Sequence, residues 1–217
     1  MDARTSGNKA AQTTTANNLK PNPAVEAKVK KMRELYADAP EIGKAALEAG
    51  LPMLIEELAA PPHLQTAGRI GLRQGKVSEL TVFLPFVKGG AKRLRGLLQL
   101  LQGNFRAADA VGTVHDMRFV FVDNDTKLLF ATAYDGDFDP YIEDFAAKIP
   151  NAMDLWLSNF EDYPGMRNPS AAKDWIAKHQ IAAEAWYVNS PNLTAAETRR
   201  LERVGKAVDE LLDKIGG

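Results

Sequence analysis

Two adjoining β-rich runs constrain the fold of this chain more than any other feature. Residues 113–123 (TVHDMRFVFVD) and 127–134 (KLLFATAY) are rich in the β-branched and aromatic side chains that favour strands. The polar pair Asn124-Asp125 lies between them, and both residue types tolerate the backbone conformations of a tight turn. The sequence therefore predicts a β-hairpin in the middle of the chain.

The segments on both sides of this hairpin predict the rest of an α+β domain. Apolar residues alternate over 80–86, which predicts a strand, and Pro85 places it near an edge or an end of its sheet. Leucines spaced for one face of a helix follow over 94–101. A helix over 138–149 and a closing strand over 152–159 (AMDLWLSN) complete the order β-α-β-β-α-β. We therefore expect a ferredoxin-like antiparallel sheet with helices on one face.

The whole chain is expected to divide into three parts. Residues 1–21 almost lack large apolar side chains, so we expect a flexible tail. Residues 22–76 carry helical periodicity and end in a Pro-containing linker, which predicts an N-terminal helical extension. The ferredoxin-like domain is then expected to occupy residues 77–217.

The C-terminal part of that domain predicts one more strand and one more helix. Residues 181–188 (IAAEAWYV) have a strand-like composition. Thr194 is followed three residues later by Glu197, the capping-box pattern that begins a helix, and apolar residues then recur at helical spacing.

Composition excludes several classes of function. The chain has 27 Lys plus Arg against 28 Asp plus Glu, so no overall charge attracts nucleic acid. It has no cysteine, which excludes disulfides, thiolate nucleophiles, iron–sulfur clusters and Cys-based zinc sites. No apolar run approaches the roughly 20 residues of a membrane span, and the first residues lack the apolar core of a secretory signal. We therefore expect a cytoplasmic protein without a membrane span.

Four short motifs occur in order along the chain: His115-x-x-Arg118-Phe119, 129–136 (LFATAYDG), Tyr141-x-x-Asp144-Phe145 and 175–181 (WIAKHQI). With them, roughly residues 78–215 resemble a bacterial family of ferredoxin-like domains of the dimeric α/β-barrel type. The wider superfamily includes dye-decolorising peroxidases, chlorite dismutase-like haem proteins, small monooxygenases with or without a cofactor, and proteins that only bind ligands. The resemblance thus implies a homodimer, a ligand between the sheet and its helices, and haem as a cofactor.

His115 and Arg118 are the first candidates for chemistry. An imidazole at the start of an apolar strand is suited to ligate haem iron or to act as a general base, although a hydrogen bond to a neighbouring carbonyl is the commoner reason for such a histidine. Alternation places His115 on one face of the strand with Met117 and Phe119, and Arg118 on the other. Arg118 is suited to bind a haem propionate or a substrate carboxylate, or to form a structural ion pair.

The remaining candidates are one histidine and three aromatic residues. His179 is the second potential metal or haem ligand, although the dipole at a helix end also accounts for a histidine there. Trp156 and Trp186 are expected to wall a pocket for an aromatic or apolar ligand, and Tyr134 to supply a catalytic hydroxyl, unless these rings only fill a core or a dimer interface.

Three hypotheses of function follow. The first is a haem-associated or aromatic-ligand-binding protein, with peroxidase or monooxygenase activity as the expected oxidoreductase chemistry. The second is a non-catalytic dimeric domain that binds a small ligand or a protein. The third is a cofactor-free monooxygenase. The sequence leaves open whether the protein is an enzyme.

Overall fold

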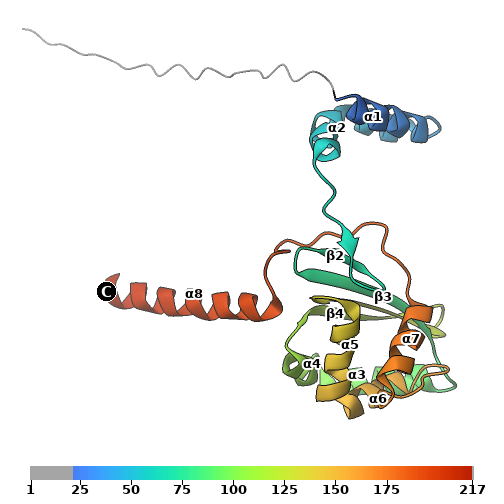
Figure 1. Cartoon of the computed structure of the whole chain (residues 1–217), viewed down its shortest axis with the longest axis vertical. Helices are drawn as coiled ribbons and strands as arrows, with labels where there is room; N and C mark the ends of the chain where they lie inside the picture. The colour runs from blue at the N-terminus through green and yellow to red at the C-terminus, as the bar shows by residue number, and fades with distance from the viewer. Residues whose placement is uncertain (1–21, 217) are drawn as a thin grey trace, which may run out of the picture. The chain divides into compact units, whose positions relative to one another are not determined.

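The computed structural model describes residues 22–216, which form two compact units divided between Pro62 and His63 (Figure 1). The predicted tail, residues 1–21, lies outside the described residues. The helical extension ends at Pro62 rather than at residue 76, because the residues that follow already pair with the sheet of the second unit.

The first unit is a pair of helices, α1 (Pro23–Leu35) and α2 (Glu41–Ala59). The side chain of Asn22 caps α1 by accepting a hydrogen bond from the amide of Ala24 at 3.0 Å. The two helices share a small apolar core made by Val25, Val29, Leu47 and Leu51. The predicted helical extension is therefore present.

A five-stranded antiparallel sheet forms the centre of the second unit. Its strands are β1 (Gln65–Thr66), β2 (Leu72–Gln74), β3 (Val77–Pro85), β4 (Val114–Val122) and β5 (Lys127–Asp135), in the order β1-β2-β3-β5-β4. The predicted hairpin is confirmed as β4 and β5, and its turn residues Asp123, Asn124 and Asp125 all have positive φ. The α+β class with an antiparallel sheet is likewise confirmed.

Five helices pack on one face of this sheet (Figure 1): α3 (Gly90–Leu101), α4 (Arg106–Val111), α5 (Phe138–Lys148), α6 (Pro150–Leu157) and α7 (Pro169–His179). The alternating residues Leu80, Val82 and Leu84 of β3 are almost fully buried beneath them. Because one face of each strand carries the apolar residues, the sheet and the helices share a single core.

Two predicted strands are wrong. Residues 152–159 form most of helix α6 instead, because Pro150 suits the first turn of a helix and Met153 and Leu157 are buried four residues apart. Residues 181–188 form no strand; only Gln180 makes an isolated bridge to Val82.

Short pieces of chain replace the missing fourth strand along the outer edge of β3. Strand β2 pairs with one end of β3, the amide of Ile181 donates to the carbonyl of Thr81, and Phe160 bridges to Phe86 at the other end. The carboxylate of Glu79 lies in this edge and is 4% exposed. It accepts a hydrogen bond from the amide of Leu72 at 3.1 Å, and burial raises its pKa.

The chain ends in helix α8 (Ala195–Gly216), and the predicted capping box is confirmed. The Thr194 amide donates to the Glu197 carboxylate at 2.7 Å, and the Glu197 amide donates to the Thr194 hydroxyl at 3.1 Å. In the described part of the chain, no helix has the length and apolar character needed to cross a membrane.

Candidate functional site

An apolar cavity of about 500 Å³ lies between the helix-covered face of the sheet and helices α3 to α7. Its floor is formed by Leu80, Val82 and Leu84 of β3 and by Phe130 of β5, where the register pairs Val82 with Phe130. Because side chains alternate across a strand, these four residues share one face. The period-two pattern that makes the strands therefore also makes the floor of the cavity.

Aromatic rings form a rigid part of the cavity wall. The ring of Trp156 on α6 stands edge-on to Phe119 at 5.1 Å and to Phe130 at 4.8 Å between centroids. Phe119 in turn stacks on Phe105 at 5.7 Å. Edge-to-face and stacked rings lock one another in place, so this side of the cavity has a defined shape.

The helices close the other sides and leave a mouth beside α4. Leu97, Leu98 and Leu101 of α3 line one wall, as the predicted leucine stripe requires. Asn104 and Arg106 line the mouth and are exposed. The exposed guanidinium of Arg106 is suited to bind an anion at this mouth.

Polar groups are few in the described lining. The hydroxyl of Tyr141 is 3.3 Å from that of Thr132, and burial raises the pKa of Tyr141, so it stays protonated. The indole N–H of Trp175 donates to the carbonyl of Glu161 at 2.9 Å. The indole N–H of Trp156 is buried without a partner in residues 22–216. The lining has no histidine, carboxylate or lysine among the described residues.

His115 lies outside this cavity, and its predicted position beside Met117 and Phe119 is wrong. A β-bulge between Val114 and Asp116 interrupts the alternation of β4. The imidazole of His115 consequently lies 2.7 Å from the carboxylate of Asp135, and its side chain is 21% exposed. The imidazole thus has a hydrogen-bond partner, although that partner is a carboxylate and not the neighbouring carbonyl expected from the sequence as the alternative.

Arg118 and His179 also lie apart from the cavity and from each other. The Arg118 guanidinium is 65% exposed and lies 3.7 Å from Asp116. His179 Nδ1 lies 2.8 Å from the carbonyl of Trp175 at the end of α7. The structure therefore does not bring His115, Arg118 and His179 together.

Of the three aromatic candidates, only Trp156 lines the cavity. Tyr134 is fully buried and stacks on Tyr141 at 3.9 Å, and burial raises its pKa as well. Trp186 is partly buried in the segment beyond α7, where its carbonyl accepts a hydrogen bond from Gln74 at 2.6 Å. The sequence patterns did not indicate Arg106 or Phe105 as site residues. The apolar spacing from Phe105 to Val111 is the signal that could have indicated the short helix α4.

The described lining of this cavity does not fit haem, the cofactor that the resemblance implies. The usual proximal ligands of haem iron are imidazole, thiolate or phenolate. The described lining has no histidine or cysteine, and Tyr141 keeps its proton. Met117 and Met153 offer thioethers, which serve cytochromes together with a histidine. No cluster of three or more potential metal ligands occurs among residues 22–216.

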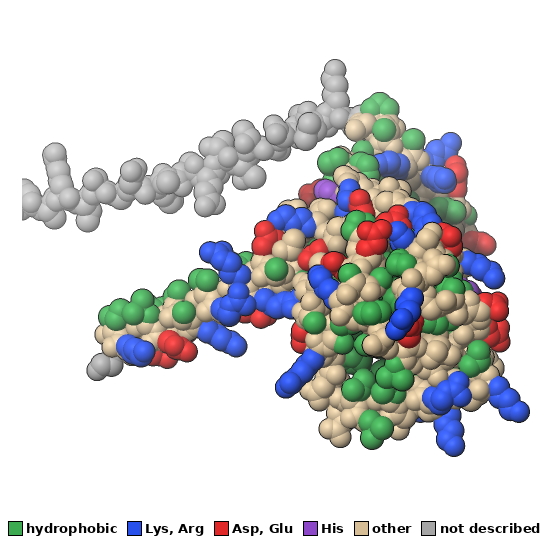
Figure 2. All heavy atoms as spheres, turned by 60° about the horizontal axis from the view of Figure 1, so that its bottom comes forward, with side chains coloured by type: hydrophobic (Ala, Val, Ile, Leu, Met, Phe, Trp, Pro, Cys, Tyr) green, Lys and Arg blue, Asp and Glu red, His purple; other side chains and the backbone are tan. Residues whose placement is uncertain are grey.

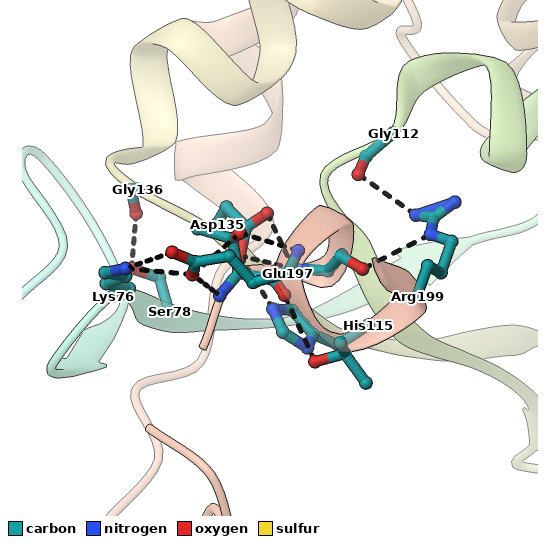
Figure 3. Close-up of polar contacts among 11 residues, drawn as sticks. Lys76, Ser78, Gly112, His115, Asp135, Gly136, Glu197 and Arg199 are labelled. Atoms are coloured by element: carbon teal, nitrogen blue, oxygen red, sulfur yellow. Dashed lines mark hydrogen bonds and ion pairs between the residues drawn. The ribbon is translucent and has the colours of Figure 1, made fainter. Parts of the chain in front are cut away.

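Apart from the cavity, a cluster of polar residues joins the start of α8 to the domain (Figure 3). Both carboxylate oxygens of Asp135 accept the amide of Ala195, at 3.2 and 3.1 Å, while His115 holds the same carboxylate from the other side. This carboxylate therefore caps α8 from a different part of the chain.

Two further contacts strengthen the join. Lys76 lies 2.8 Å from both oxygens of Glu197, and this contact, with the hydrogen bonds from Thr194, lowers the pKa of Glu197 to about 2. Arg199 donates to the carbonyl of Gly112 at 3.0 Å (Figure 3). The first turn of α8 is thus held by groups from three separate segments.

Comparison with known proteins adds no assignment, because no family model, curated protein or solved structure matches this chain. The resemblance to dimeric α/β-barrel domains therefore stays a prediction.

Proposed function

We propose that the second unit binds a small molecule with an apolar body and one anionic end in the cavity between the sheet and helices α3 to α7. The observation that supports this most is the cavity itself, whose volume of about 500 Å³ lies within the usual range of small-ligand sites. This develops the small-ligand alternative within the second sequence-based hypothesis, a non-catalytic dimeric domain that binds a small ligand or a protein.

The chemistry of the lining defines the ligand. Leu, Ile, Val, Met and Phe side chains surround the body of the ligand, so affinity comes from removing apolar surface from water. Arg106 at the mouth favours a carboxylate at the exposed end. A medium-chain fatty acid or an aromatic acid has this combination.

The three tryptophans allow the site to be tested with an internal control. Trp156 and Trp175 line the cavity and Trp186 does not. We expect titration with dodecanoate to shift the indole N–H resonances of Trp156 and Trp175 in an ¹H–¹⁵N spectrum and to leave that of Trp186 in place. A uniform shift of all three, or no shift up to the solubility of dodecanoate, would refute the proposal.

Two pairs of variants separate the cavity from nonspecific apolar binding. Ala108→Phe places a ring in the lining and should weaken binding at least tenfold, whereas Ala110→Phe on the exposed side of the same helix should not. Arg106→Gln should weaken dodecanoate about fivefold, the value of an exposed ion pair near 1 kcal/mol, and leave dodecan-1-ol unchanged. Arg118→Gln on β4 is the matched control.

A further inference from the structure

Helix α8 carries a stripe of exposed apolar residues (Figure 2). In a seven-residue repeat abcdefg, Leu201, Val208 and Ile215 occupy position a, and Val204 and Leu211 occupy position d. Their exposures range from 46% for Val208 to 73% for Ile215. Leu212, at position e, widens the stripe and is 60% exposed.

The described part of the chain leaves this stripe uncovered. Every residue from 200 to 216 is exposed. The first turn is held by Asp135, Lys76 and the carbonyl of Gly112, so the polar cluster fixes the direction in which α8 leaves the domain. Most of the stability of a helix in a protein comes from packing its apolar face, and α8 has no such packing within residues 22–216.

The residue types at the core positions favour one partner, an identical helix. β-branched residues at a and leucine at d favour two parallel strands, and α8 has Val208 and Ile215 at a and Leu211 at d. The first repeat has the opposite order, with Leu201 at position a and Val204 at position d.

Charges beside the stripe are complementary in a parallel pair. Arg200, Arg203 and Lys214 lie on one flank, at positions g and c, and Glu202 and Asp209 lie on the other, at position b. In a parallel pair, opposite flanks of the two helices face each other; in an antiparallel pair, like flanks do. Glu210 is an exception on the basic flank, where it is four residues before Lys214 and can pair within its own helix.

We propose that α8 pairs with α8 of a second copy of this chain as a parallel, two-stranded coiled coil. Gly205 at position e leaves room for Arg200 to reach across the seam to the partner's Glu202 or the partner's Asp209. This interface differs from the pairing of two sheets that the family resemblance implies. It is also independent of the proposed ligand site.

The pair is short and therefore weak. Residues 200–216 extend about 26 Å at 1.5 Å per residue, which is little more than two heptads. An interface of this size falls below that of stable complexes, so we expect weak association. The proposal predicts a concentration-dependent equilibrium between monomer and dimer.

Sedimentation equilibrium of the full chain, from low to high micromolar concentration, tests the interface. Val208→Asp puts a charge in the seam and should leave only monomer, whereas Lys206→Asp, at the outward position f, should change the dissociation constant by less than about threefold. A wild-type monomer at all concentrations would overturn the proposal. So would a dimer that Val208→Asp leaves intact, as pairing of sheets would produce.

Cross-linking tests the orientation, because the chain has no cysteine of its own. A parallel pair brings two copies of residue 215 together, so Ile215→Cys should form a disulfide-linked dimer under mild oxidation. An antiparallel pair in which positions a face positions d would separate them by roughly 27 Å at 1.5 Å per residue. Asp213→Cys, on the outer side of the same turn, is the control. Failure of Ile215→Cys to cross-link, or equal cross-linking of both variants, would overturn the parallel arrangement.

Discussion

The carboxylate of Asp135 should determine how firmly α8 is attached to the domain. Asp135→Ala removes the acceptor of the Ala195 amide and the partner of His115 at once. The Ala195 amide and the Asp135 carboxylate are both sheltered from water, since Ala195 is 5% exposed and the Asp135 side chain is 13% exposed. Water therefore replaces the lost acceptor poorly.

The magnitude follows from the contacts. Replacement of a capping side chain by alanine costs about 0.5 to 2 kcal/mol, and a buried donor without a partner costs about 1 to 3 kcal/mol. These two effects describe the same lost bonds and are not additive. We therefore expect a loss of about 2 kcal/mol in the free energy of opening the first turn of α8.

Amide hydrogen exchange measures this opening directly. About 2 kcal/mol corresponds to roughly 30-fold faster exchange of the amides of Thr198 and Arg199, with a much smaller change in β3 and β5. Asp109→Ala is the matched control, because its carboxylate is 78% exposed and lies 3.8 Å from Arg199. The reasoning is refuted if Asp135→Ala leaves exchange in α8 unchanged, or if Asp109→Ala has an equal effect.

Two remaining predictions concern the stability of the domain. Gly90→Ala should destabilise the domain by about 2 kcal/mol in urea unfolding, because the added Cβ would lie 2.3 Å from the carbonyl oxygen of Asn159. Gly96→Ala in the same helix meets nothing within 4 Å and should stabilise the domain by up to about 1 kcal/mol. Equal effects of the two variants would contradict the packing argument. Burial raises the pKa of Glu79 in the folded state, so its contribution to the unfolding free energy is largest at low pH and declines as pH rises toward its folded pKa. The stability of the wild type relative to Glu79→Gln should thus decrease as pH rises above the ordinary glutamate pKa of about 4.3, and an increase would contradict the pKa direction.

Local sequence patterns predicted the elements whose structure is decided locally. The hairpin of β4 and β5 depends on its strand-forming runs and its turn residues, and the start of α8 depends on Thr194 and Glu197. Each of these signals lies within a few residues of the element it produces. They were therefore readable without knowledge of the rest of the fold.

The errors arose where long-range packing decides the structure. Residues 152–159 form a short apolar run, which suits a buried helix as well as a buried strand. The bulge that turns His115 toward Asp135 depends on how β4 pairs with β5, which alternation alone does not specify. Arg106 became a candidate only when the fold placed α4 beside the cavity.

The fragmentary outer edge of β3 has a consequence for access to the core. Within residues 22–216, the backbone just after helix α7 pairs with β3 where Gln180 bridges to Val82 and the Ile181 amide donates to the Thr81 carbonyl. Ion pairs of Asp174 with Arg69 and of Lys173 with Glu143 hold the helix itself, and its Trp175 and Ile176 form part of the cavity wall. A hinged movement of α7 would thus break very few sheet bonds and leave the pairing of β3, β5 and β4 intact.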